Sequence, residues 1–115
     1  MSDNTEVAKF ALELRRGTLI MLVLSRLKKP MYGYSLVKQL EDGGVPIEAN
    51  TLYPLMRRLE TNGLLSSEWE TSGTKPRKYY CITPKGLALL EQYQHYWQEF
   101  SAKVNHLLEA DLNDT

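Results

Sequence analysis

The sequence predicts a mainly helical α+β fold, in which four helices accompany one small β-hairpin. Three observations favour this fold class. Apolar residues recur at helical spacing in four separate segments, and two short runs rich in strand-forming residues are joined by a turn-forming loop. The hairpin also lies directly between the third and fourth helical segments. With 115 residues, 43% of them hydrophobic, the chain can build one core of its own.

The first two helices are predicted over residues 7–27 and 33–42. From Leu19 onward the first segment is apolar on nearly every side, which is typical of a helix buried at the centre of a domain. The run KKP ends this helix, because proline cannot continue a helix and lysines suit a C-terminus. The run GGVP ends the second helix, since two glycines and a proline favour chain reversal.

The third predicted helix lies within the run ANTLYPLMRRLETNGLL, residues 49–65. Asn50 or Thr51 is expected to cap its start, and the NG dipeptide is expected to end it, with Gly63 in the left-handed conformation. Its inward stripe consists of Leu52, Leu55, Met56 and Leu59. Because the stripe defines the inner face, the side chains expected outside it are Tyr53, Arg57 and Arg58.

A β-hairpin is predicted to follow the third helix. Its two strands cover residues 64–70 and 77–83, and the loop TSGTKP between them is rich in turn-forming residues. Neighbouring side chains of a strand point to opposite faces of the sheet. One of Tyr79 and Tyr80 is therefore expected in the core, and the other at the surface.

The last predicted helix covers roughly residues 84–111, with Thr83 as its cap and Pro84 at its first position. At 1.5 Å per residue this helix would reach about 40 Å. It carries a seam of apolar side chains spaced 3, 4, 3, 4 and 3 residues apart, as in a heptad repeat. The seam consists of Leu90, Tyr93, Trp97, Phe100, Val104 and Leu107.

This seam either packs on its own domain or binds a second chain. Short helices and a hairpin cannot cover all of it, and seams of this kind bind other helices, so a partner chain is expected. We predict a two-fold homodimer joined through the seam, with Phe10 or Leu14 of the first helix contributing. The chain accordingly divides into a globular domain, residues 1–83, and a dimerisation helix, residues 84–115.

The formal net charge of zero hides a segregation of charge along the chain. Residues 1–14 hold one Lys against three acidic residues, a net charge of −2. Residues 15–85 hold twelve Lys and Arg against six acidic residues, or +6, and residues 86–115 hold one Lys against five, or −4. A basic middle between acidic ends indicates where a polyanion such as nucleic acid would bind.

Nothing in the sequence favours an enzyme, a metal site or a cofactor. Cys81 is the single cysteine, and with no evident basic partner we interpret it as an inert small residue. His95 and His106 lie three turns apart, about 16 Å along the last helix, which is too far for one metal ion to bridge. No glycine-rich phosphate loop, acid pair or catalytic triad order is present in the sequence.

The sequence also predicts a cytoplasmic protein without a membrane segment. Its start is acidic before it is basic and lacks the pattern of a signal peptide. The longest apolar run, TLIMLVL, is too short to span a bilayer.

Two helices, a recognition helix and a hairpin follow one another as in a winged helix-turn-helix. At this level the chain resembles the PadR family of bacterial transcriptional regulators, from about Arg15 to Leu90. The resemblance is carried by RRGTLIMLVLSRLKKPMYGYSLVKQL, NTLYPLMRRLETNGLL and RKYYCITPKG. The single C-terminal helix resembles the smaller of the family's two subgroups. Cys81 departs from the pattern, since a basic or polar residue is commoner there.

The resemblance implies double-stranded DNA as the partner, and groove dimensions imply the contacts. The major groove admits one helix, whose first turns meet base edges, while a wing and a second helix contact the backbone. The residues expected to contact DNA are Tyr34, Ser35, Asn50, Thr51, Tyr53, Arg57, Arg58, Lys75, Arg77 and Lys78. For Arg57, Arg58 and Lys75 a solvated role is the alternative. Tyr53 and Tyr32 could instead serve mainly as packing residues.

The expected function is a sequence-specific, DNA-binding transcriptional regulator acting on a dyad-symmetric operator. Relatives in the family respond to small aromatic or phenolic compounds, so a repressor released by such a ligand is expected. The ligand residues would be Trp97, Tyr93 and Phe100 in the seam, although aromatic rings in a helical interface are more often plain packing. The rival hypothesis is a protein-interaction module that dimerises without reading DNA, which the salt dependence of DNA affinity would distinguish.

Overall fold

Residues 2–113, the part of the chain that this computed structural model describes, form four helices and three strands. This confirms the mainly helical α+β fold class. The elements in chain order are α1 (Ser2–Arg26), β1 (Met31–Tyr32), α2 (Gly33–Asp42), α3 (Ala49–Thr61), β2 (Leu65–Glu70), β3 (Arg77–Ile82) and α4 (Pro84–Asn113).

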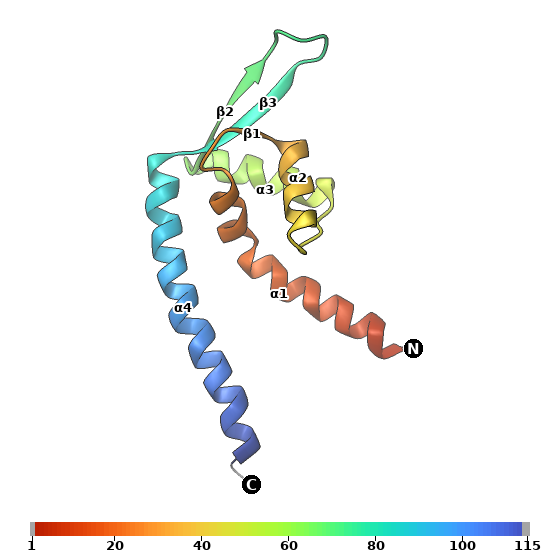
Figure 1. The fold of residues 1–115 in the computed structure, drawn as a ribbon, viewed down its shortest axis with the longest axis vertical. Helices are drawn as coiled ribbons and strands as arrows, with labels where there is room; N and C mark the ends of the chain where they lie inside the picture. Colours follow the sequence, from red (N-terminus) through yellow and green to blue (C-terminus); the bar gives the residue numbers. More distant parts are fainter. Residues whose placement is uncertain (1, 114–115) are drawn as a thin grey trace.

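A compact part and two projecting helices make up the molecule (Figure 1). The C-terminal half of α1 packs with α2 and α3 beneath the small sheet. The β2–β3 hairpin projects as a wing at the top of the view. The N-terminal half of α1 and most of α4 leave the compact part as two diverging arms. The molecule is therefore elongated, with extents of 65 × 38 × 22 Å.

The sheet has one more strand than the sequence predicted. Its order is β1-β3-β2, and all pairs are antiparallel. The two-residue strand β1 pairs Met31 with Tyr80 and Tyr32 with Tyr79. A run of two residues after a proline carries no periodicity of its own, so only its pairing with β3 makes it a strand. The consequence is that the segment leading into α2 is tied directly to the wing.

The core lies where α1, α2, α3, the sheet and the start of α4 meet. Fully buried residues include Leu24, Leu27, Leu36, Leu52, Met56, Leu59 and Leu90. Burial of α1 is confined to its second half, as the all-round apolar pattern predicted, since Phe10 and Leu14 are exposed. Tyr80 is buried while Tyr79 is half-buried, in agreement with their predicted opposite orientations.

Leu90 corrects one prediction. The heptad pattern placed it in a dimer interface, but it is only 2% exposed within the single chain and belongs to the domain core. Its side chain therefore has almost no surface left for a partner. The physical reason is that the first turns of α4 continue the packing of the globular domain, and the free seam starts only beyond them.

The ends of the helices agree with the sequence in most places. Gly63 has a φ of 78°, the left-handed conformation that ends α3. Thr83 Oγ1 accepts a hydrogen bond of 3.0 Å from the Gly86 N–H and so caps α4, which begins at Pro84 as predicted. The expected cap of α3 was wrong, because Glu48 holds that position and Asn50 and Thr51 are already helical.

Candidate nucleic-acid interface

Helix α3 has a buried face and a solvent face, as its stripe predicted. Leu52, Met56 and Leu59 are buried, and the opposite face is exposed. The predicted contact residues on that exposed face are Asn50, Thr51, Arg57 and Arg58. No hydrogen bond or ion pair within the described part of the chain engages either arginine side chain. Both guanidinium groups are therefore available to a ligand.

Tyr53 has a packing role at this surface. The residue is half-buried, and its ring lies against Gly33 at the start of α2. A Cβ atom at Gly33 would be only 2.3 Å from Tyr53 Cε1, so no larger residue fits beside the ring as it stands. Gly33, which has no side chain, thus lets α2 and α3 approach closely.

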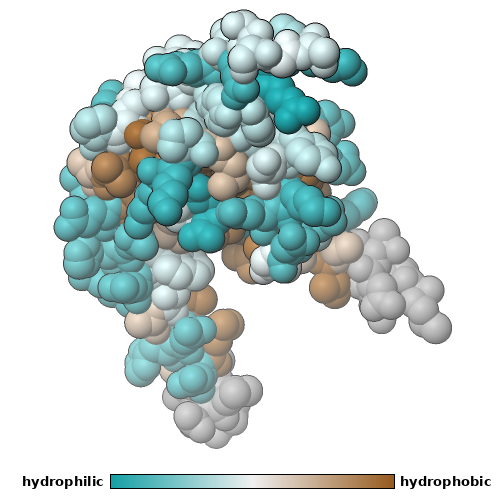
Figure 2. Space-filling model, turned by 45° about the horizontal axis from the view of Figure 1, so that its top comes forward, coloured by the Kyte–Doolittle hydropathy of each residue, from teal (hydrophilic) through white to brown (hydrophobic). Residues whose placement is uncertain are grey.

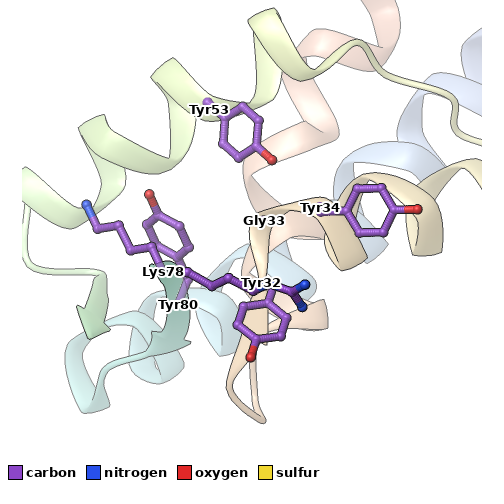
Figure 3. Close-up of a pocket in the computed structure, with 7 residues that line it drawn as sticks. Tyr32, Gly33, Tyr34, Tyr53, Lys78 and Tyr80 are labelled. Carbon is purple, nitrogen blue, oxygen red and sulfur yellow. The ribbon is translucent and has the colours of Figure 1, made fainter. Parts of the chain in front are cut away.

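A cavity of about 460 Å³ separates α3 from the wing and brings together residues from three segments. Figure 3 shows the lining residues Tyr53 on α3, Lys78 and Tyr80 on β3, and Tyr32, Gly33 and Tyr34 at the β1–α2 junction. Arg77 also lines the cavity. Four phenol rings and two cations therefore surround one open space, although they are far apart in the sequence.

The start of α2 borders the same cavity. Tyr34 is 72% exposed, whereas Ser35 is half-buried. Backbone N–H groups in the first turn of a helix lack intrahelical partners and favour anions. This end of α2 thus presents a phenol and free N–H groups beside the wing.

The three cations of the wing differ in how freely they can bind. Lys75 and Arg77 are exposed, and Lys78 is half-buried. The Lys78 Nζ lies 3.4 Å from Glu60 Oε1, near the end of α3, and 5.3 Å from the centroid of the Tyr80 ring. Lys78 is therefore partly neutralised inside the protein, an ion pair that the sequence pattern did not indicate.

Glu60 also joins α3 to the wing through a hydrogen bond that Ser67 of β2 donates to its Oε2. One carboxylate thereby contacts both strands of the hairpin. This linkage connects α3 to the wing, and only the folded arrangement reveals it.

A second acidic residue, Glu70, is the last residue of β2 and lies at the loop end of the wing. Its carboxylate accepts hydrogen bonds from the hydroxyls of Tyr79, Tyr32 and Ser72. The hydrogen bonds from Tyr79, Ser72 and Tyr32 hold the pKa of Glu70 below its ordinary value. The hydrogen bond to Glu70 in turn raises the pKa of Tyr79 above its ordinary value. Glu70 is thus a carboxylate, and Tyr79 a neutral phenol, at neutral pH.

The seam of α4 is largely exposed within the single chain. Exposed fractions are 36% for Tyr93, 43% for Trp97, 48% for Phe100, 36% for Val104 and 65% for Leu107. Figure 2 shows apolar surface on one side of the projecting part of α4 and hydrophilic surface on the other. Exposed apolar side chains in a contiguous stripe are typical of an interaction surface.

No helix among residues 2–113 is long and apolar enough to cross a membrane. No group of three or more His, Cys, Asp or Glu side chains in that part of the chain could hold a metal ion.

The arrangement defines a DNA-binding winged helix: a helix with a polar, cationic outer face, a second helix crossing behind it, and a wing with cations beside it. The model of the PadR-like family of transcriptional regulators matches residues 20–92. The chain therefore belongs to the PadR-like family. Members of this family are transcription regulators rather than enzymes.

Known transcriptional regulators are similar to this chain along most of its length. A PadR family transcriptional regulator from Eggerthella lenta DSM 2243 is 58% identical and covers 95% of this chain and 97% of its own, with a TM-score of 0.91. A transcriptional regulator from Clostridium thermocellum is 32% identical over 82% of this chain and 96% of its own, with a TM-score of 0.77. A transcriptional regulator of Mycobacterium tuberculosis is 34% identical over 64% of this chain and 69% of its own.

Proposed function

We propose that the protein is a homodimeric, sequence-specific repressor that binds a dyad-symmetric operator in the cytoplasm and is released by a small planar aromatic or phenolic ligand. One observation carries the DNA part of this proposal. Tyr53 of α3 and the wing cations Arg77 and Lys78 line one cavity, and the exposed Asn50 and Arg57 lie one helical turn to either side of Tyr53, so one duplex can meet both α3 and the wing. The family membership supports the same reading.

The contacts divide into two kinds. Asn50 and Thr51 lie in the first turn of α3, so we assign them to base edges and nearby phosphates, and Arg57 to a guanine or a phosphate. Backbone contacts fix the register on DNA without reading sequence. We assign these to Arg58 of α3, Tyr34 and Ser35 of α2, and Lys75, Arg77 and Lys78 of the wing. Tyr53, also near the start of α3, is assigned with Asn50 and Thr51 to base edges and nearby phosphates.

The homodimer is supported by the unpartnered seam. Its exposed apolar side chains on α4 are those of Tyr93, Trp97, Phe100, Val104 and Leu107. On α1, the projecting half exposes Phe10 and Leu14 at 70% and 74%. A two-fold pairing would bury both sets at once, because a C2 interface is self-complementary. We therefore propose that residues 84–115 act mainly as the dimerisation helix, and residues 1–83 as the DNA-binding domain.

Two substitutions test the DNA assignment. Arg57→Ala is expected to cost about 1–3 kcal/mol and to relax the preference at one base position, if this arginine reads a base edge. Lys78→Ala is expected to weaken binding to all sequences about equally and to lower the slope of log affinity against log salt. If both variants bind DNA like the parent, the assignment of the DNA-binding face is wrong. DNA affinity that does not depend on salt would favour the protein-interaction module instead.

The ligand part rests on the aromatic side chains of the seam. Tyr93, Trp97 and Phe100 are each between 36% and 48% exposed, so a planar ligand between two such helices could stack on them. A ligand that touches both subunits would alter the spacing of the recognition helices and thereby DNA affinity. Titration of planar and phenolic compounds against the fluorescence of Trp97, in a Trp69→Phe background, tests this. Quenching that never accompanies a change in DNA affinity would contradict it.

A further inference from the structure

A carboxylate lies among the cations of the wing, where DNA phosphates would approach. Glu70 lines a hollow with Tyr32, Lys75 and Arg77. Glu70 and Arg77 are also direct partners in the register of β2 and β3. Opposite charges at such cross-strand positions ordinarily attract one another into an ion pair. An ion pair here would withdraw Arg77 from the DNA.

The structure shows a different partner set for Glu70. Tyr32 Oη lies 2.9 Å from Glu70 Oε2 and 2.7 Å from Tyr79 Oη, and Tyr79 Oη also donates to Glu70 Oε2. The two phenol rings stack with centroids 4.2 Å apart and an interplanar angle of 19°. On the other side, Ser72 Oγ donates to Glu70 Oε1 at 2.9 Å. Hydroxyl groups thus satisfy both carboxylate oxygens without any cation.

Arg77 attracts the Glu70 carboxylate electrostatically but forms no ion pair with it. Among the residues that the structure describes, its side chain makes no hydrogen bond or ion pair. Its guanidinium carbon lies 5.3 Å from the centroid of the Tyr32 ring, within the range of a cation–π contact. The same ring that helps to satisfy Glu70 therefore supports the guanidinium beside the cavity.

We infer that the phenol pair Tyr32 and Tyr79 positions Arg77 for DNA. The two hydroxyls occupy the Glu70 carboxylate, which would otherwise capture Arg77, and the Tyr32 ring holds the guanidinium in place. Tyr32 and Tyr79 act through Arg77, so they are positioning residues. This inference rests on the proposed function, since it matters only if Arg77 contacts DNA phosphate.

The state of the network at neutral pH agrees with this role. Its hydrogen bonds hold the pKa of Glu70 below its ordinary value, so the carboxylate keeps its charge and its attraction for Arg77. A carboxylate that lost both phenol hydroxyls would retain its charge but lack two donors. Arg77, its cross-strand neighbour, is the cation placed to replace them.

The test uses the double substitution Tyr32→Phe with Tyr79→Phe, which removes the hydroxyls and keeps the rings. DNA affinity of the full chain is measured by fluorescence anisotropy over a series of salt concentrations. Affinity is expected to fall by about fivefold to tenfold, as for one lost charge-assisted contact. The slope of log affinity against log salt should fall by about one, because one phosphate contact is lost.

Two further variants separate diversion of Arg77 from simple damage to the fold. Adding Glu70→Gln to the double variant removes the charge that captures Arg77, so affinity and slope should return to those of the parent. In an Arg77→Ala background, the phenylalanine pair should have no further effect. Tyr96→Phe on α4, an exposed phenol far along the chain from the wing, is the matched control and should change nothing.

The possible outcomes distinguish the inference from the proposed function. If Arg77→Ala binds DNA like the parent, Arg77 is no DNA contact, and this part of the proposed function fails together with the inference. If Arg77→Ala weakens binding but the phenylalanine pair does not, the inference alone is overturned. The same holds if the pair weakens binding and Glu70→Gln fails to restore it, since the hydroxyls would then serve only to stabilise the wing.

Discussion

Replacing Phe100 by alanine should weaken the proposed dimer strongly. Phe100 is 48% exposed in the single chain and stacks on Tyr96, with ring centroids 5.6 Å apart. An aromatic side chain buries about 150–250 Å² in full, so on the order of 100 Å² remains for a partner. At about 25 cal/mol per Å² this surface contributes about 2.5 kcal/mol for each chain. Two-fold symmetry doubles the loss to about 5 kcal/mol.

A loss of this size raises the dimer dissociation constant by roughly 4,000-fold. Sedimentation velocity over a dilution series measures it directly, with the free energy of unfolding followed separately. His95→Ala is the matched control, because His95 is exposed and lies two residues from Trp97, on the opposite side of α4. His95→Ala should dimerise like the parent. If Phe100→Ala did so too, the seam would not be the interface and the reasoning from exposed area would be refuted.

Two further substitutions test the links between α3 and its neighbours. Glu60→Gln frees Lys78 from its ion pair, so affinity for all DNA sequences should rise about twofold to fivefold. The free energy of unfolding, measured by urea titration, should change by less than about 1 kcal/mol. Weaker DNA binding would contradict this and show that Glu60 chiefly aligns the wing. Gly33→Ala should lower the free energy of unfolding by about 1–3 kcal/mol, because the new Cβ would meet the Tyr53 ring at 2.3 Å. The same change in a Tyr53→Ala background should cost far less, and equal costs in both backgrounds would contradict the clash.

The sequence predicted the elements whose residues repeat at a regular spacing. The stripe through Leu52, Met56 and Leu59 determined both the existence of α3 and the face that it buries. Local chemistry predicted the ends of elements where one residue decides, as with Gly63 after α3 and Thr83 before α4. These features depend on neighbours in the chain, so a single sequence is sufficient to find them.

Features that depend on distant contacts were missed or misplaced. Strand β1 exists only because Met31 and Tyr32 pair with β3, far along the chain. Leu90 fits the heptad spacing of the seam, but its side chain is buried in the domain core. Spacing alone cannot tell a helix position covered by its own domain from one left for a partner, since both require an apolar residue.

The candidate site shows the same division. The exposed residues of α3 followed from its inward stripe, whereas the engagement of Lys78 by Glu60 required the relative placement of α3 and the wing. The Glu70 network could be predicted from the sequence in part, because the hairpin register places Glu70 opposite Arg77. That register alone would have suggested an ion pair, and only the position of Tyr32 on β1 shows that phenols take its place.

Selection of preferred sites from a pool of random DNA duplexes tests the central claim most directly. A homodimer that reads DNA with α3 should enrich two inverted half-sites, whose centres are separated by about 10–10.5 base pairs or a multiple of that spacing. Repeating the selection with Arg57→Ala should relax one position in each half-site and leave the spacing unchanged. Enrichment of no motif, or of a single site without symmetry, would contradict the account.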